Sequence, residues 1–308
     1  MCDATIQLVM KKIVLIAVTA LIPLCGNAQD PRALNSVVLP GAQPQLAGTG
    51  YGFTEGCSVS ADGRVFFTDQ PNDKIYVWDE HTGISLFKSG CERSNGTYID
   101  REGNLLACAD LFNKLVKFTP VGEMIAVYAG GYNGKHFNGP NDLWPDKKGG
   151  IYFTDPYYHR DYWEEGHTKQ LDVQGVYYRK PSGEIIQVIS DFVQPNGIVG
   201  TPNGELLYVA DIGARIVWRY AINRDGTLSQ KSNFAPAGSD GMTIDAKGNV
   251  YLTFGKVLIY NKKGQKAGEI DLPESPSNVC LGGKDRKTLF ITARTSVYTL
   301  KTIVRGVE

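Results

Sequence analysis

A phrase that occurs six times along the chain constrains the fold more than any other feature. Each copy is a turn with a small or polar residue, usually glycine, followed by an apolar strand that often ends in Thr-Asp or Ala-Asp. The copies are spaced by about 45 residues on average, a period typical of repeat architectures. They lie at residues 61–69, 101–110, 148–155, 202–211, 246–253 and 285–292.

Short alternating segments flank these copies, for example 97–99 and 242–244 before the turn and 74–78 and 215–220 after the strand. Several short strands per unit, joined by Gly or Asn turns, indicate an antiparallel blade. Six such units predict an all-β, six-bladed β-propeller, because radial repetition leaves few exposed sheet edges. Two stacked β-sandwiches are the disfavoured alternative. Residues 37–39 are expected to supply a closing strand to the last blade.

The first 28 residues are expected to be a signal peptide. A lysine pair precedes the apolar run 13–24, and a small-x-small site ends at Ala28. The run is too short for a transmembrane helix. Residues 1–9 fall outside this pattern, which is consistent with a misassigned start. We therefore expect an exported protein, periplasmic or secreted, with residues 29–308 as one propeller domain and no transmembrane segment after removal of the leader.

Charge and cysteine usage exclude several functions. Lys and Arg number 32 and balance 32 Asp and Glu, with no basic stripe among them, which argues against nucleic-acid binding. The expected mature chain has no Cys-x-x-Cys pair, so a zinc ribbon or redox motif is unsupported. One or two disulfides and buried free thiols both stay open. The cysteines concerned are Cys57, Cys91, Cys108 and Cys280.

Polar residues precede each copy, where the first strand of each blade would begin. In a propeller this strand lines the central channel, so these side chains can converge. Singly, an Asn-Gly or Asp-Gly pair indicates an ordinary turn. Recurrence in phase favours a ring of oxygen donors instead, with Asn or Asp at five starts and Glu at the sixth. The starts are 54–56, 93–96, 139–142, 194–197, 239–242 and 276–278.

Such a ring suits a hard divalent cation. Carboxylate and amide oxygens without His or Cys favour Ca²⁺ first and Mg²⁺ or Mn²⁺ after it, with Zn²⁺ still open. A zinc triad of histidines is not supported, because all four histidines lie outside the recurring starts. They are His81, His136, His159 and His167.

Seven short strings occur in order: Glu-Gly at 55–56, Arg-Ser-Asn-Gly at 93–96, Asn-Gly-Pro-Asn-Asp at 138–142, Asp-Pro at 155–156, Gln-Gly-Val-Tyr at 174–177, Pro-Asn-Gly at 195–197 and Asp-Gly-Met-Thr-Ile-Asp at 240–245. Together, from about Val37 to Leu300, they resemble the senescence marker protein, gluconolactonase and luciferin-regenerating enzyme-like family. The resemblance implies a six-bladed propeller with one divalent metal in the channel, and the hydrolysis of sugar lactones as substrates.

The resemblance also implies roles for particular residues. Two departures, Cys57 in place of a proline and Ala109-Asp110-Leu111 in place of Glu-His, leave the identity of the substrate open. The implied metal ligands are Glu55, Asn196, Asp240 and Asn141; Arg93 and Asn95 match the substrate-facing pair, beside Asn141, and Asp240 matches the general base.

The expected chemistry is metal-assisted attack of water on the lactone carbonyl. Asp240 would accept the proton of that water, although an Asp bound to a cation is a poor base, so its role is positional as much as basic. Arg93 and Asn95 can donate hydrogen bonds to substrate oxygens. The alternative for Arg93 is a structural ion pair with neighbouring Glu92.

The segment 156–174 is the longest departure from the repeat and is rich in aromatic residues. These side chains can stack on a sugar or cap the site. A surface loop pinned by its own aromatic residues is the alternative reading. The residues concerned are Tyr157, Tyr158, His159, Tyr162, Trp163 and His167.

Two other functions stay open. One is a related metal-dependent phosphotriesterase or arylesterase, because the same cation polarises P=O as well as C=O. The other is a propeller that binds a ligand without turnover. A Gly-x-Ser-x-Gly elbow, a Walker loop and a dinucleotide fingerprint are absent from the sequence.

Overall fold

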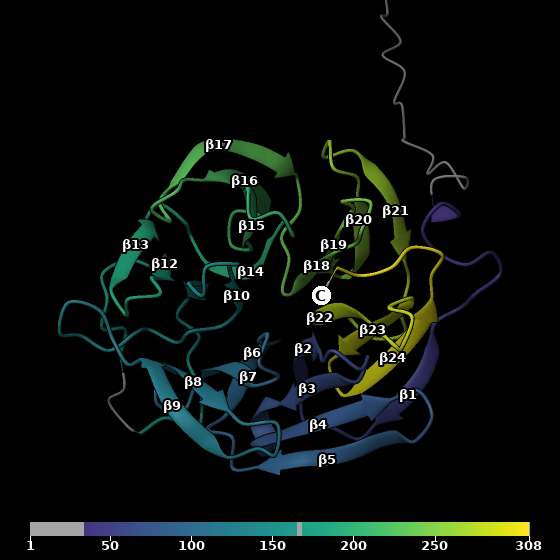
Figure 1. Cartoon of the computed structure of the whole chain (residues 1–308), viewed down its shortest axis with the longest axis horizontal. Coiled ribbons are helices and arrows are strands. Elements are labelled where there is room, and N and C mark those ends of the chain that lie inside the picture. The colour runs from purple at the N-terminus through teal and green to yellow at the C-terminus, as the bar shows by residue number, and fades with distance from the viewer. Residues whose placement is uncertain (1–33, 165–167, 308) are drawn as a thin grey trace, which may run out of the picture.

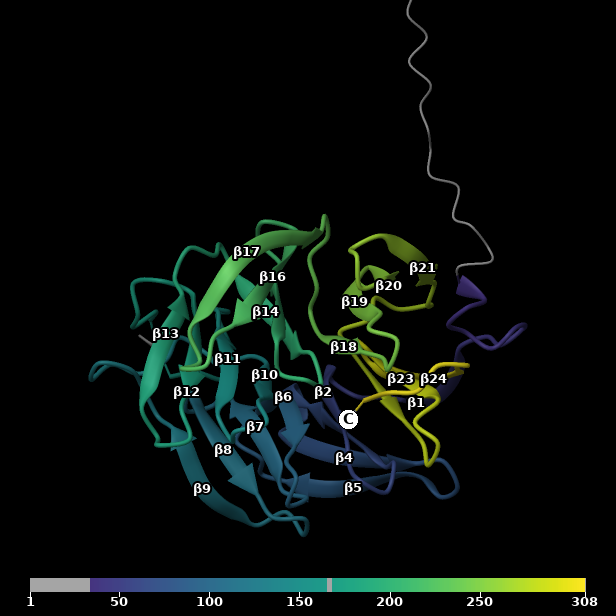
Figure 2. The same cartoon turned by 45° about the horizontal axis from the view of Figure 1, so that its top comes forward.

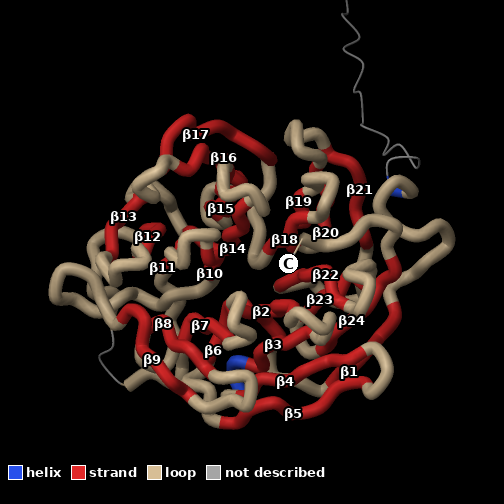
Figure 3. Tube along the Cα trace, in the orientation of Figure 1, coloured by secondary structure: helices blue, strands red, loops and turns tan. Residues whose placement is uncertain are grey.

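Six four-stranded antiparallel sheets stand around a common axis in the computed structural model, which describes residues 34–164 and 168–307 (Figure 1). This confirms the six-bladed β-propeller and excludes stacked sandwiches. The expected leader at 1–28 and His167 lie outside the described residues. Strands dominate the regular structure, and the 3₁₀ helix η1 (Gln70–Asn72) is a short exception (Figure 3).

The first three blades follow the chain in order, each running from its inner to its outer strand. Blade 1 is β2 (Thr54–Val59), β3 (Val65–Asp69), β4 (Lys74–Asp79) and β5 (Gly83–Ser89); blade 2 is β6 (Ser94–Ile99), β7 (Leu105–Ala109), β8 (Lys114–Phe118) and β9 (Met124–Ala129); blade 3 is β10 (Leu143–Pro145), β11 (Ile151–Asp155), β12 (Gly175–Arg179) and β13 (Ile185–Ile189).

The remaining blades repeat the pattern. Their inner strands and those of the first three contact one another around the ring, which confirms that the first strand of each unit faces the axis. Blade 4 is β14 (Pro195–Gly200), β15 (Leu206–Asp211), β16 (Ile216–Ile222) and β17 (Leu228–Ala235); blade 5 is β18 (Met242–Ile244), β19 (Val250–Phe254), β20 (Lys256–Tyr260) and β21 (Lys266–Ile270); blade 6 is β22 (Asn278–Gly282), β23 (Thr288–Ala293), β24 (Ser296–Lys301) and, from the other end of the chain, β1 (Gln45–Thr49).

The ring is closed by β1, which pairs antiparallel with β24 and puts Gln45 opposite Thr299. Both views place these strands side by side (Figure 2). The prediction of a closing strand at 37–39 is therefore wrong in position, since Val38 forms an isolated bridge to Thr302 beyond the end of β24. Two prolines in the segment 40–44 lack amide protons, so ladder pairing resumes after Pro44.

The core lies between blades and comes largely from the strand of the recurring phrase. Phe67, Tyr152 and Tyr251 of these second strands are fully buried. Phe67 of blade 1 packs on Phe290 of blade 6 with ring centroids 5.5 Å apart, so closure also buries aromatic surface. Truncating a side chain of this kind to alanine costs about 3–5 kcal/mol.

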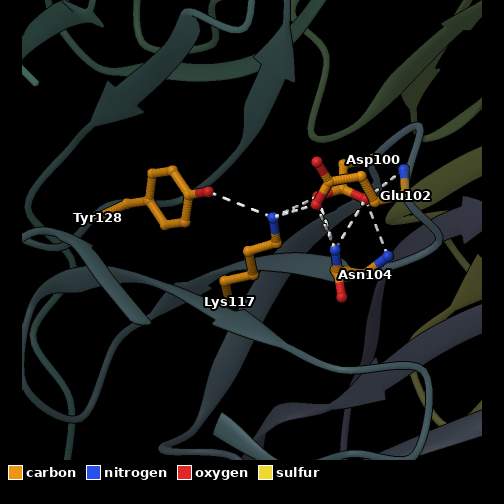
Figure 4. A network of polar contacts seen from close by, with 5 residues as sticks. All are labelled: Asp100, Glu102, Asn104, Lys117 and Tyr128. Carbon is orange, nitrogen blue, oxygen red and sulfur yellow. Dashed lines mark hydrogen bonds and ion pairs between the residues drawn. The ribbon is translucent and has the colours of Figure 1, made fainter. Parts of the chain in front are cut away.

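In blade 2, the polar residue just before the recurring phrase holds the turn between β6 and β7. In blade 2, Asp100 Oδ1 accepts the backbone N–H groups of Glu102 and Asn104 at 2.9 and 2.8 Å. Lys117 of β8 reaches the same turn, 2.8 Å from Asp100, and also donates to Tyr128 of β9 (Figure 4). Burial opposes the charge of Lys117, but these hydrogen bonds prevail and raise its pKa. One buried cation on β8 thus contacts β9 and the turn between β6 and β7.

Of the two alternatives left open for the cysteines, disulfides or buried free thiols, the structure shows free thiols. Cys57, Cys91, Cys108 and Cys280 are all buried and free. Across 34–164 and 168–307, no helix has the length and apolar character needed to cross a bilayer.

Candidate active site

Three of the six predicted site residues sit at β-bulges near the start of inner strands. In β2 the pairing with β3 shifts between Glu55 and Ser58, in β6 it shifts between Ser94 and Thr97, and in β14 between Pro195 and Ile198. A bulge places two residues opposite one and redirects the extra side chain. Glu55, Asn95 and Asn196 therefore leave the ordinary alternation of the sheet.

Glycine follows each of these residues because neighbouring blades meet there. A Cβ on Gly56 or Gly96 would overlap the carbonyl oxygen of Asn95 or Asn141, and one on Gly197 would lie 2.5 Å from that of Asp240. The interpretation of Asn95-Gly96 and Asn196-Gly197 as turn dipeptides is therefore wrong. They are strand residues whose missing side chains let successive blades interlock around the axis.

Two carboxyl groups meet at this point. Glu55 is 5% exposed, and its Oε2 accepts the Gly56 N–H at 2.9 Å. Asp240, half-buried just before β18, lies close enough to hydrogen-bond with Glu55. Burial, followed by the neighbouring Asp240, raises the pKa of Glu55 well above its usual range. Burial also raises the pKa of Asp240 to about 6.

The side-chain amide of Asn196 lies against Asp240. Asn196 is 2% exposed, and its Nδ2 donates to Asp240 Oδ1 at 2.8 Å and to Tyr158 Oη at 2.9 Å. Its Oδ1 is buried and has no hydrogen-bond partner among the described residues. The same holds for Oδ1 of Asn95. A buried acceptor without a partner is costly, so these oxygens suit a ligand.

Asn141 and Asn278 complete the surroundings. Asn141 is buried just before β10, and its carbonyl accepts the Gly96 N–H at 2.8 Å. Asn278, which sequence reasoning noted without assigning a role, donates from Nδ2 to Glu55 Oε2 at 3.2 Å. The Cys57 thiol lies 3.7 Å from Asn278 Oδ1 and donates to it. The departure at Cys57 thus orients a side chain of the site.

Arg93 lies apart from this group, at a pocket of about 650 Å³ near the ends of the inner strands. Its guanidinium donates to the carbonyl of Pro71 and stands 4.6 Å from the ring of Tyr162. The alternative of an ion pair with Glu92 is wrong, because Glu92 pairs with Lys114 at 3.0 Å. Arg93 is therefore placed to meet a ligand at the pocket rather than the buried carboxylates.

The loop after β11 forms the other wall of this pocket with His159, Arg160 and Tyr162. Asp110, the departure after β7, anchors it: Arg160 Nε lies 2.8 Å from its carboxylate, and Tyr162 donates to the same oxygen. The indole N–H of Trp163 donates to the Asp110 carbonyl at 3.0 Å. Sequence reasoning identified the aromatic loop but not its anchor.

The donor set decides which cation these residues suit. In the part of the chain that the structure describes, no three His, Cys, Asp or Glu side chains cluster. The convergent donors are instead two carboxylates and amide oxygens, which suit a hard cation such as Ca²⁺. These residues therefore offer a cation oxygen atoms only. One of them, Asn196 Oδ1, is buried and has no hydrogen-bond partner among the described residues.

Comparison with known proteins finds similar proteins that are named as lactonases. A gluconolactonase of Zymomonas mobilis subsp. mobilis is 29% identical over 270 residues, covering 79% of this chain and 76% of that protein. The pentonolactonase XacC of Haloferax volcanii is 26% identical over 246 residues, covering 74% and 77%. A solved gluconolactonase from Xanthomonas campestris shares the fold with a TM-score of 0.81 at 24% identity, covering 88% and 92%.

The family assignment rests on the match to a family model. The model of the SMP-30/Gluconolactonase/LRE-like region matches residues 53–295, from the start of blade 1 to the end of β23 and beyond. The ordered strings of the sequence fall within this span. The chain therefore belongs to the SMP-30/Gluconolactonase/LRE-like family.

Proposed function

We propose that this protein is a divalent-cation-dependent lactonase that opens sugar lactones. The observation that carries the proposal is the close pair of carboxyl groups, Glu55 and Asp240, together with Asn196, whose buried Oδ1 has no hydrogen-bond partner among the described residues. A pocket of about 650 Å³ lies at Arg93. The lactonases among its relatives support the reaction class. The pocket is large enough for a monosaccharide lactone.

Glu55, Asp240 and Asn196 Oδ1 would hold the cation, with Asn141 at the start of the neighbouring inner strand as a further ligand. A bound divalent cation supplies a Lewis acid for the lactone carbonyl. Ca²⁺ is the proposed ion because every donor is an oxygen.

The residues of the chain account for the rest of the reaction. A water oxygen attacks the carbonyl carbon, the ring C–O bond breaks, and the ring oxygen takes a proton to give the hydroxy acid. Asp240 Oδ1 is held by Asn196, so Oδ2 is the oxygen that takes the proton from water. Arg93 at the pocket and Asn95 in the channel donate hydrogen bonds to substrate oxygens.

The experiment is a pH-stat assay of acid release from glucono-1,5-lactone and other sugar lactones. The purified protein is assayed after EDTA treatment and after adding back Ca²⁺, Mg²⁺, Mn²⁺ or Zn²⁺. We expect cation-dependent release that is lost in Glu55→Gln and Asp240→Asn, by about 10²–10⁴-fold for the proton acceptor. Glu184→Gln, an exposed substitution in blade 3, is the matched control.

The rival functions give different results in the same assay. Turnover of a phosphotriester or aryl ester, with every lactone left intact, would replace the lactonase by the related esterase. Cation binding without turnover of any substrate would favour a ligand-binding propeller.

A further inference from the structure

One hydroxyl group of the loop after β11, that of Tyr158, contacts the Asn196 side chain. Tyr158 Oη accepts a hydrogen bond from Asn196 Nδ2 at 2.9 Å, and the same nitrogen donates to Asp240 Oδ1 at 2.8 Å. Both amide protons of Asn196 are thus engaged. The remaining polar atom of the amide, Oδ1, is buried without a partner among the described residues.

The two acceptors have different roles in this arrangement. The carboxylate of Asp240 decides which end of the amide faces it, since an oxygen there would be repelled. The hydroxyl of Tyr158 fixes the rotation of the amide plane by accepting the second proton. Hydrogen bonds of this kind to ligating side chains orient the ligand and raise metal affinity.

The ring of Tyr158 is itself held in place. The guanidinium of Arg160 stands over it, 5.3 Å from the ring centroid. Arg160 is fixed in turn by Asp110, whose side chain is 3% exposed and lies 2.8 Å from Arg160 Nε. A continuous set of contacts therefore runs from blade 2, through the loop, to Asn196 in blade 4.

We propose that Tyr158 is a positioning residue of the cation site, which holds the Asn196 amide so that Oδ1 faces the ion, and that Asp110 keeps the loop in place for this. The inference rests on the proposed function, because it requires the cation at Glu55, Asp240 and Asn196. It gives the aromatic loop a role beyond lining the pocket. By linkage, cation binding and loop docking stabilise each other to the same extent.

The test is calorimetric titration of the cation-free full chain with Ca²⁺. We expect Tyr158→Phe, which removes a single oxygen, to weaken Ca²⁺ binding about tenfold or more. The matched control is Tyr157→Phe on the same loop, whose ring packs on Trp163 at 5.9 Å and whose hydroxyl has no hydrogen-bond partner among the described residues. Its affinity should stay within about twofold of the unsubstituted protein.

A second variant tests the loop from its other end. Asp110→Asn removes the charge that fixes Arg160 and should weaken Ca²⁺ binding severalfold, with the thermal midpoint recorded to show that the variant is folded. Equal Ca²⁺ affinity in Tyr158→Phe and the unsubstituted protein would overturn the inference and leave the lactonase proposal standing. An unsubstituted protein that binds no divalent cation would overturn both.

Discussion

A missing side chain decides how close the blades come at the site. Gly56, Gly96 and Gly197 each follow a polar residue, and each lies against the backbone of the next blade. These carbonyl oxygens lie in or just before inner strands, so they cannot move away without disturbing those strands. The polar residue and its glycine therefore act as one unit. The polar residue supplies a side chain to the site, and the glycine lets the residue of the next blade come close to it.

Gly197→Ala tests this unit. The added methyl group would lie 2.5 Å from the Asp240 carbonyl oxygen, so we expect a loss of about 1–3 kcal/mol in the free energy of unfolding and weaker cation binding. Gly130→Ala is the control, because a Cβ there meets nothing within 4 Å. Urea unfolding followed by tryptophan fluorescence measures both. Equal stability in the two variants would contradict the role given to the glycine.

The neighbouring carboxyl groups of Glu55 and Asp240 make the effect of a cation depend on pH. Burial raises the pKa of Asp240 to about 6 and that of Glu55 well above its usual range. Without a cation the folded protein therefore binds protons more tightly than the unfolded chain. The contribution of this pair to the free energy of unfolding is present at low pH, and it is lost as pH rises through the pKa values of the folded state.

A cation that binds the ionised pair removes this penalty. The rise in thermal midpoint on adding Ca²⁺ to EDTA-treated protein should therefore be small near pH 5 and grow toward pH 8. Thermal unfolding with and without Ca²⁺ across this range measures it, and the difference cancels the titration of other groups. Asp240→Asn should flatten the dependence. A rise that is the same at every pH would argue against cation binding by these carboxylates.

At the scale of strands and loops, the sequence is informative where the pattern is local. The recurring phrase predicts the second strand of each blade, and the polar starts predict that Glu55, Asn196 and Asp240 converge. The bulges were not predictable, since register is a relation between two strands and not a property of either. The loop has no period, so the contact of Tyr158 with Asn196 was visible only after folding.

The pocket is formed by two such irregular elements, the η1 segment and the loop after β11, with Arg93 between them. Arg93 lies outside the buried donor group and donates to the Pro71 carbonyl. Its effect on a substrate should therefore be on binding more than on the chemical step.

We expect Arg93→Met to raise KM for the lactone about tenfold while kcat changes little, because a charge-assisted hydrogen bond contributes about 1.5–3 kcal/mol. Steady-state kinetics on the lactone with the fastest turnover measure both constants. Arg64→Met, on the turn of blade 1, is the control. A fall in kcat at constant KM would instead place Arg93 on the group where charge develops.

At the scale of the whole molecule, we expect the stability of the ring to depend on the pairing of β1 with β24, which closes it. Five blades are each built from one continuous stretch of chain, whereas blade 6 joins β1 to β24 from opposite ends. The channel residues Glu55 and Asn278 lie on either side of this junction and are hydrogen-bonded to each other. Opening the ring would therefore also separate donors of the site.

A disulfide across the closure tests this. Gln45 and Thr299 are directly opposite each other in antiparallel strands, where Cα separations of about 4.5–5.5 Å suit a disulfide. The Gln45→Cys, Thr299→Cys variant should gain stability on oxidation, up to about 5 kcal/mol for a loop of this length in the chain-entropy account. The reduced form of the same variant is the control, and urea unfolding measures both. No gain in a fully oxidised sample would mean that unfolding starts elsewhere in the ring, with β1 and β24 still paired.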